Sequence, residues 1–218
     1  QTPNPKPQTP NPKPRRNARR VAVGEGLNNI NMRVLTDEEL TAFFQKLSKY
    51  IGESIKYLVD TGEDAPEKVF RMIKNRVYYL STDMLRQASV FGRDELMHCG
   101  TCFGQFSGAG KFRLSITALD YIAKYAKAKV WLKGSGEQNF VYGNHVLKAH
   151  IARISENAVK YSGVVILSLS NIPLGFGVLA KSAEELKTAD PTSIYVFNQA
   201  DVGQYLRIEG DHKSEKDE

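Results

Sequence analysis

The segment Gly104–Lys111 reads GQFSGAGK and carries part of the pattern of a phosphate-binding loop. Such a loop needs a glycine five residues before its Gly-Lys pair, and a Ser or Thr after the lysine to hold Mg²⁺. Gln105 and Phe112 occupy these two positions. The segment therefore indicates a turn between two strands and argues against a nucleotide site.

Two cysteines and two histidines have spacings that also occur in metal sites. Cys99 and Cys102 form a Cys-x-x-Cys pair, but no second Cys or His pair completes a tetrahedral zinc site. His145 and His150 are five residues apart, with Glu156 further along, and no third ligand stands at metal spacing. We interpret the thiols as buried or half-buried and the histidines as surface or packing residues. The sequence predicts no catalytic residue, no metal and no cofactor.

Basic and aromatic side chains are interleaved in the second half of the chain. Basic side chains neutralise phosphates, and exposed aromatic rings stack on unpaired bases. Trp131, Tyr142 and Tyr161 stand near lysines and arginines, although each alone also fits a core aromatic or a solvated lysine. The candidate RNA-binding residues are Lys133, Lys148, Arg153, Lys181, Lys187 and Arg207.

Net charge is +6 over 218 residues, and it is unevenly distributed. Residues 1–31 hold six basic side chains against Glu25 alone, whereas the acidic tail 209–218 holds five acids and two lysines. Residues 1–14 are QTPNPKP written twice, which favours an extended, disordered tail. The RRNARR run that follows reads as a nuclear address or a nucleic-acid arm, or as a solvated tail with no specific role. We expect residues 1–31 to lie outside the core fold.

The elements that would position the basic residues lie in a second domain, residues 129–208. GVVILSLSNIPLGFGVLA at Gly163–Ala180 consists of two apolar β-rich runs around an Asn-Ile-Pro turn, which predicts a hairpin. KVWLK from Lys129 alternates like a half-buried strand, a Gly-rich loop and a short helix follow, and Arg153–Tyr161 is a polar connector. A short helical turn at Ser182–Leu186 precedes closing strands at Ile194–Phe197 and Val202–Ile208. Many short strands with intervening turns predict a barrel-like β domain.

The first domain, residues 32–126, has mixed α/β patterning with a mainly antiparallel sheet. Thr36 and Glu39 have capping-box spacing, and apolar residues at helical intervals predict a helix that ends near Gly52. Further expected elements are a short strand at Ile55–Asp60, a loop in TGEDAPEK, a hairpin of Val69–Ile73 with Arg76–Leu80, a helix from Ser81 or Thr82 to Phe91, strands at Leu96–Phe106 and Lys111–Thr117, and a helix at Leu119–Tyr125. The predicted fold class is α+β.

Several sequence blocks carry a resemblance to a known family. The Gly163 hairpin resembles the central hairpin of a PUA domain, a small β pseudo-barrel that binds RNA. The chain also resembles the Nip-seven family of large-ribosomal-subunit biogenesis factors in the same order over residues 32 to about 208. The matching blocks include Met32-Arg-Val-Leu-Thr-Asp-Glu-Glu, Lys49-Tyr-Ile-Gly-Glu53, Gly100-Thr-Cys-Phe-Gly104, Tyr142-Gly-Asn-His-Val-Leu-Lys148, Asn171-Ile-Pro-Leu-Gly-Phe-Gly177 and Gln199-Ala-Asp-Val-Gly203.

The resemblance implies a non-catalytic assembly factor of the large (60S) subunit that acts in pre-rRNA processing in the nucleus and nucleolus. Its C-terminal PUA domain would bind U-rich or single-stranded pre-ribosomal RNA. Its N-terminal domain would contact other assembly factors and exosome components. We expect a monomer. We also expect no membrane segment, because the apolar runs reach only strand length.

The RNA-binding surface and the function both leave alternatives open. Glu184 and Glu185 lie between Lys181 and Lys187, where some relatives carry several basic residues, so RNA contacts would shift toward Lys148 and Arg153. An RNA-modification enzyme, or its accessory subunit, is the alternative function, because PUA domains often accompany modifying domains. A protein-interaction scaffold with incidental RNA contact is the third.

Overall fold

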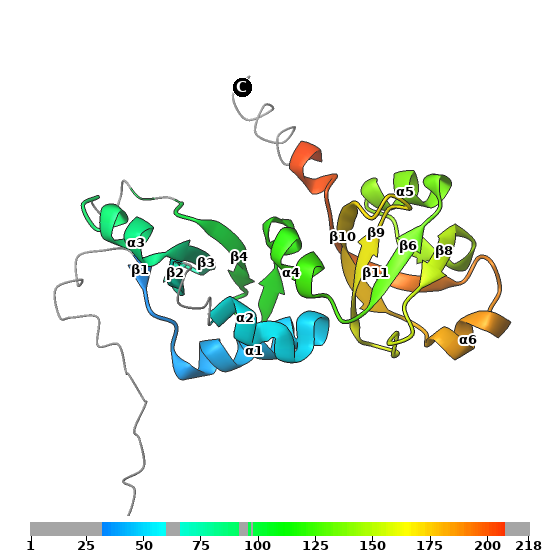
Figure 1. Ribbon diagram of the computed structural model, residues 1–218, viewed down its shortest axis with the longest axis horizontal. Helices are drawn as coiled ribbons and strands as arrows, with labels where there is room; N and C mark the ends of the chain where they lie inside the picture. Colours follow the sequence, from blue (N-terminus) through cyan, green and yellow to red (C-terminus); the bar gives the residue numbers. More distant parts are fainter. Residues whose placement is uncertain (1–31, 60–65, 92–95, 97, 208–218) are drawn as a thin grey trace, which may run out of the picture.

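The computed structural model describes residues 32–59, 66–91, 96 and 98–207, which form two lobes side by side (Figure 1). The first lobe contains a five-stranded sheet, and the second a six-stranded sheet. Our expectations for the tails, residues 1–31 and 209–218, and for most of the loop TGEDAPEK fall outside the described residues.

The sheet of the first lobe is antiparallel throughout, in the order β1-β2-β3-β4-β5. One face packs on the first helix, α1, through Phe43 and Leu47, and the other packs on α3 through Leu85. The β2–β3 hairpin has the predicted turn, in which Lys74 adopts a φ of 53°. The bounds are β1 (Met32–Arg33), β2 (Lys68–Ile73), β3 (Arg76–Ser81), β4 (Thr101–Phe106) and β5 (Phe112–Leu114).

Helix α1 (Asp37–Ile51) forms as its sequence predicts. Thr36 Oγ1 accepts a hydrogen bond from Glu39 N at 3.3 Å, and the Glu39 carboxylate accepts one from Thr36 N at 2.9 Å, which completes the capping box. The helix ends at Gly52, whose φ of 58° favours glycine. Its buried face is thereby fixed against the sheet.

Four predictions for this lobe differ from the structure. Ile55–Asp60 was predicted as a strand, but its described residues are helical, in η1 (Gly52–Ile55) and α2 (Lys56–Val59). Only Leu58 of the last four is buried, and a run this short does not reveal its period. Helix α3 (Thr82–Ala88), capped by Ser81, stops before Phe91, and both β4 and β5 are shorter than predicted.

One hydrophobic cluster spans both lobes, and the second lobe also has a core of its own. η2 (Ile116–Ala118) and α4 (Leu119–Tyr125) lead from the first sheet to the second lobe. Tyr50 of α1 packs edge-on against Phe176 with ring centroids 5.4 Å apart, and its carbonyl accepts a hydrogen bond from Lys127 N. The core of the first lobe therefore continues into Val165 and Ala200 of the second, which fixes the relative position of the lobes.

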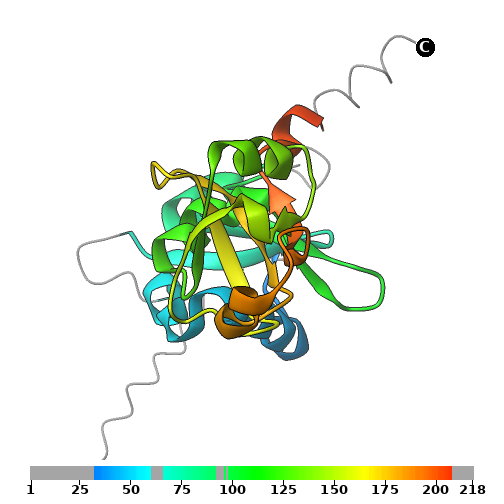
Figure 2. The ribbon, with the colours of Figure 1, turned by 90° about the vertical axis from the view of Figure 1, so that its right-hand side faces the viewer.

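The second lobe is a nearly closed barrel with strand order β7-β11-β10-β9-β6-β8. β6 and β9 are parallel, and the other neighbours are antiparallel. The edge strands β7 and β8 follow each other in the chain through η3, so the sheet curls back on itself. Figure 2 shows α5 and α6 on opposite sides of this barrel. The bounds are β6 (Lys129–Leu132), α5 (Gly134–Val141), β7 (Val146–Leu147), η3 (Lys148–His150), β8 (Ile151–Ile154), β9 (Gly163–Leu167), β10 (Pro173–Leu179), α6 (Ala183–Thr188) and β11 (Ile194–Asp201).

The predicted hairpin is β9–β10, and the predicted fold class is confirmed. Two details differ. The Gly-rich segment lies within α5, where Gly136 packs so closely on His150 that a Cβ would lie 2.6 Å from the His150 Cβ. The strand predicted at Val202–Ile208 is absent among its described residues, because β11 runs on to Asp201 and the chain then turns into a helical segment that ends the described residues at Arg207.

Candidate nucleic-acid interface

A hollow beside α6 brings together two lysines and two exposed aromatic rings. Tyr161 is 67% exposed and Phe197 is 38% exposed, and both line a cavity of about 400 Å³. Lys160 and Lys181 stand at its sides, and the Lys160 Nζ lies 5.4 Å from the Tyr161 ring centroid. We call this site, lined by Lys160, Tyr161, Ala180, Lys181, Glu185, Thr188, Ala189 and Phe197, the α6 hollow.

Segments far apart in the chain build the α6 hollow. Tyr161 adopts a φ of 63° just before β9, and its N donates to Leu179 O at 2.8 Å. Phe197 lies on β11, paired with Val178 of β10. The arrangement offers rings for base stacking and ammonium groups for phosphates.

Glu185 takes part in the N-terminal cap of α6. Its carboxylate accepts a hydrogen bond from Ser182 N at 3.0 Å, and Ser182 Oγ accepts one from Glu185 N at 3.2 Å. Lys160 Nζ lies 3.5 Å from the same carboxylate. These contacts hold the pKa of Glu185 below its ordinary value, chiefly through the bond from the Ser182 N–H. The acid that seemed to weaken this surface is thus a helix-capping residue.

Lys148 supports the other end of α6. Its Nζ donates to Ala189 O at 2.5 Å and to Lys187 O at 3.2 Å. A cation at these carbonyls satisfies acceptors that the helix leaves free and complements its dipole. Lys148 therefore positions α6, whereas the Lys187 side chain is exposed beside it.

The remaining predicted residues lie outside the α6 hollow. The guanidinium of Arg153 is 3.7 Å from the Trp131 ring centroid, and Trp131 Nε1 donates to Asn171 Oδ1 at 2.7 Å. Asn171 follows β9 and Tyr161 precedes it, so this group sits at the opposite end of that strand. Lys133 Nζ donates to Ala149 O at 3.2 Å.

Arg207 makes its contacts within the second lobe. Its Nη2 contacts both carboxylate oxygens of Asp201, at 2.8 and 2.9 Å, and its Nη1 donates to Val141 O at 2.7 Å. The Asp201 side chain is only 2% exposed. A buried carboxylate needs such a partner. The Arg207 guanidinium is therefore engaged in pairing the Asp201 carboxylate within the second lobe.

The weaker chemical motifs have structural roles. GQFSGAGK covers the end of β4 and the turn to β5, which is closed by hydrogen bonds from Ser107 N to Lys111 O and from Gly110 N to Ser107 O. Burial raises the pKa of both thiols, Cys99 and Cys102. Among the residues that the structure describes, no three His, Cys, Asp or Glu side chains gather as a metal site. No helix in the same residues has the length and apolar character needed to cross a membrane.

Comparison with known proteins agrees with this architecture. A family model described as "NIP7/UPF0113, pre-PUA domain" matches residues 32–116, and one described as "UPF0113 PUA domain" matches residues 128–210. This chain belongs to the NIP7 family. NIP7 proteins are non-catalytic biogenesis factors, so the predicted family and the predicted absence of enzyme activity are confirmed.

Curated relatives of the NIP7 family cover almost the whole fold. The "60S ribosome subunit biogenesis protein NIP7 homolog" of Xenopus tropicalis is 56% identical over 178 residues, which span 82% of this chain and 98% of that protein. The Schizosaccharomyces pombe protein of the corresponding name is 52% identical over the same shares. A PUA-domain crystal structure from Aeropyrum pernix K1 has a TM-score of 0.53 at 14% identity, covering 80% of this chain and 88% of that one, which supports the fold alone.

Proposed function

We propose that this protein binds a single-stranded, U-rich segment of pre-ribosomal RNA through the α6 hollow while the 60S subunit is assembled. Its curated relatives are named for 60S subunit biogenesis, and its second lobe matches a PUA domain. The observation that carries the proposal is the hollow itself, which the exposed Tyr161 and Phe197 rings line together with Lys160 and Lys181. Single strands are recognised by this combination of stacking platform and cation.

The wider setting belongs to the same proposal. The protein acts as a monomer in the nucleolus, and its first lobe contacts other assembly factors and exosome components. The relatives' part in subunit biogenesis supports this setting. Lys133, Arg153 and Lys187 are exposed and supply further contacts along the RNA, whereas Lys148 acts through α6.

Fluorescence anisotropy with labelled oligouridylate, compared with duplex RNA, tests the α6 hollow. We expect Phe197→Leu to cost about 1–3 kcal/mol of binding free energy, because it removes a stacking ring and keeps the apolar bulk. Lys181→Gln should weaken binding roughly tenfold through a lost phosphate contact. Lys148 is unsuitable for this test, because its substitution would also uncap α6.

Two matched controls separate the hollow from general charge and aromatic content. Tyr142 is 72% exposed on the same lobe but does not line the hollow, so Tyr142→Leu should leave affinity unchanged. Lys56 is exposed on the first lobe, and Lys56→Gln should do the same. Equal losses in the hollow variants and in the controls would refute the site. Unchanged affinity in every variant would favour a scaffold with incidental RNA contact.

A further inference from the structure

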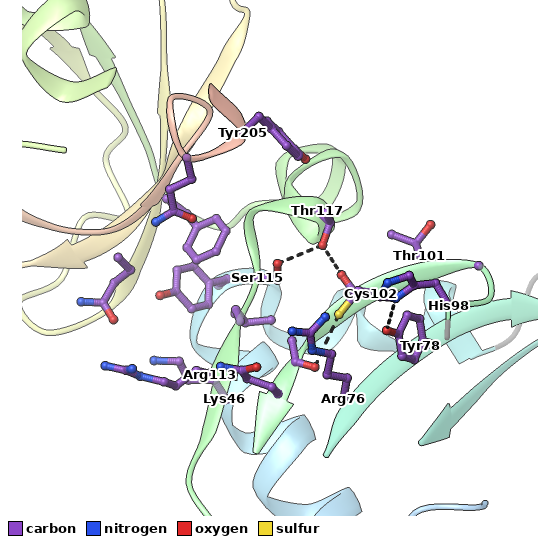
Figure 3. A pocket seen from close by; sticks show the side chains of 18 of the residues that line it. Lys46, Arg76, Tyr78, His98, Thr101, Cys102, Arg113, Ser115, Thr117 and Tyr205 are labelled. Atoms are coloured by element: carbon purple, nitrogen blue, oxygen red, sulfur yellow. Dashed lines mark hydrogen bonds between the residues drawn. The ribbon is translucent and has the colours of Figure 1, made fainter. Parts of the chain in front are cut away.

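A second concave surface lies in the seam between the lobes (Figure 3). This seam groove has a volume of about 990 Å³. One wall comes from α1 and strands β3, β4 and β5, and the other from β10, β11 and the helical segment after β11. The shared core around Tyr50 and Phe176 fixes both walls, so the groove is a preformed feature.

The first wall carries a row of cations on neighbouring strands. Arg76 of β3 is paired in register with Gln105 of β4, and Gln105 is paired with Arg113 of β5. Directly opposed residues project on the same face of a sheet, so an amide stands between two exposed guanidinium groups. Lys46 of α1 lies beside Arg113 (Figure 3).

These cations have no counter-charge in the part of the groove that the structure describes. No lining residue is an Asp or Glu, and none of the ion pairs among the described residues includes Lys46, Arg76 or Arg113. Burial, followed by the charges of Lys49 and Arg113, lowers the pKa of Lys46. Like charges gathered without a carboxylate repel one another, and a bound anion would relieve that repulsion.

Uncharged donors complete the surface. Tyr50 lines the groove, is 1% exposed, and its buried hydroxyl has no hydrogen-bond partner among the described residues. A buried hydroxyl is costly when unpaired, so an acceptor oxygen from a ligand would suit it. The opposite wall presents the amides of Gln199 and Gln204 and the ring of Tyr205, which is 46% exposed.

The seam groove adjoins the α6 hollow along one strand. Phe197 of β11 lines the hollow, and the next residues, Asn198 and Gln199, line the groove. A single strand that left the hollow along β11 would therefore next pass Asn198 and Gln199.

We propose that the seam groove binds the phosphate backbone of the same single-stranded RNA, as a second subsite that continues from the α6 hollow. The identity of the ligand as RNA rests on the proposed function. Arg76 and Arg113 contact phosphates, and Tyr205 stacks on a base at the mouth of the groove. The first lobe then takes part in RNA binding together with the PUA domain.

The test is fluorescence anisotropy on the full chain with oligouridylates of about 4 and about 16 nucleotides, the range that single-strand-binding domains cover. The short strand fits the hollow alone, and the long strand reaches both subsites. Arg76→Gln combined with Arg113→Gln should weaken the long strand roughly 100-fold, at about tenfold for each lost phosphate contact. It should also reduce the slope of log affinity against log salt by about 1.4. The short strand should bind as before.

Two further variants guard against an effect on folding or on net charge. Lys111→Gln removes one charge from the same hairpin as Arg113 but outside the groove, and should leave both strands unaffected. Gln199→Glu places a carboxylate on the opposite wall with little change of shape, and should weaken the long strand alone. Thermal melting confirms that each variant is folded.

The outcomes separate this inference from the proposed function. Long-strand affinity that is unchanged in the double variant and in Gln199→Glu overturns the inference and leaves the α6 hollow intact. Sensitivity to the groove variants, with none to Phe197→Leu or Lys181→Gln, upholds the groove and refutes the hollow. If a glutamate-rich peptide binds with dependence on Arg76 and Arg113 while RNA does not, the groove is a site for an acidic protein segment, and the inference is wrong.

Discussion

Arg207→Met is expected to destabilise the protein without weakening RNA binding by the folded molecule. Arg207 makes two contacts of 2.8 and 2.9 Å with the Asp201 carboxylate, which is 2% exposed. Breaking a buried ion pair by removing one partner costs about 3–5 kcal/mol. The Arg207 side chain is 44% exposed and Asn198 Nδ2 still donates to Asp201 at 3.1 Å, so water and this amide reduce the loss to about 2 kcal/mol.

Thermal unfolding followed by circular dichroism measures this effect. For a chain of this size, 1 kcal/mol corresponds to about 2–4 °C in Tm, so Arg207→Met should lower Tm by roughly 4–8 °C. Adding Asp201→Asn removes the uncompensated charge and should recover part of the loss. Oligouridylate affinity, measured well below the transition, should match that of the unchanged protein.

The opposite pattern would refute this reasoning. If Tm stays constant while RNA affinity falls tenfold, Arg207 is an RNA contact, as predicted from the sequence. If adding Asp201→Asn to Arg207→Met recovers none of the lost stability, the buried carboxylate is not the source of the instability.

Two further predictions concern stability. Hydrogen bonds from the Arg33 guanidinium lower the pKa of Glu39 to about 2. The contribution of the Glu39 carboxylate to folding stability is therefore complete above the ordinary pKa of a glutamate, and it is lost as the pH falls toward 2. Chemical denaturation across this range should show Glu39→Gln less stable by about 1 kcal/mol at pH 7, with the difference disappearing near pH 2. A Cβ at Gly163 would lie 2.5 Å from the buried Tyr50 ring, so Gly163→Ala should cost about 1–3 kcal/mol in the same assay. Gly134→Ala, with nothing within 4 Å, is the control and should cost nothing.

Local signals in the sequence were sufficient for most elements. The capping box at Thr36 and the apolar spacing after it predicted α1, and two apolar runs around an Asn-Ile-Pro turn predicted the β9–β10 hairpin. The segment from Ile55 to Val59 was misassigned because so short an apolar run fits either period. Local patterning predicts elements that satisfy their own backbone and bury one face, and it fails where tertiary contacts decide.

The surfaces depend on such distant contacts. Tyr161 and Phe197 meet through the pairing of β9, β10 and β11, and Arg76 and Arg113 align only because β4 lies between their strands. Arg207 binds Val141 O across 66 residues. No spacing in the sequence indicates these contacts between distant residues. The sequence alone therefore identified candidate basic residues in the second domain, but not which of them lack an internal hydrogen-bond partner.

The two surfaces contribute different interactions to the binding of a single strand, stacking in the α6 hollow and charge in the seam groove. In the α6 hollow Glu185 offsets Lys160, and only Lys181 adds charge, so the exposed rings supply most of the affinity. The seam groove carries Arg76, Arg113 and Lys46, with no carboxylate among the residues lining it that the structure describes. Because counterion release scales with the phosphates neutralised, salt dependence should arise mainly in the groove and base preference in the hollow. A ring substitution would then lower affinity at every salt concentration, whereas an arginine substitution would change how steeply affinity falls with salt.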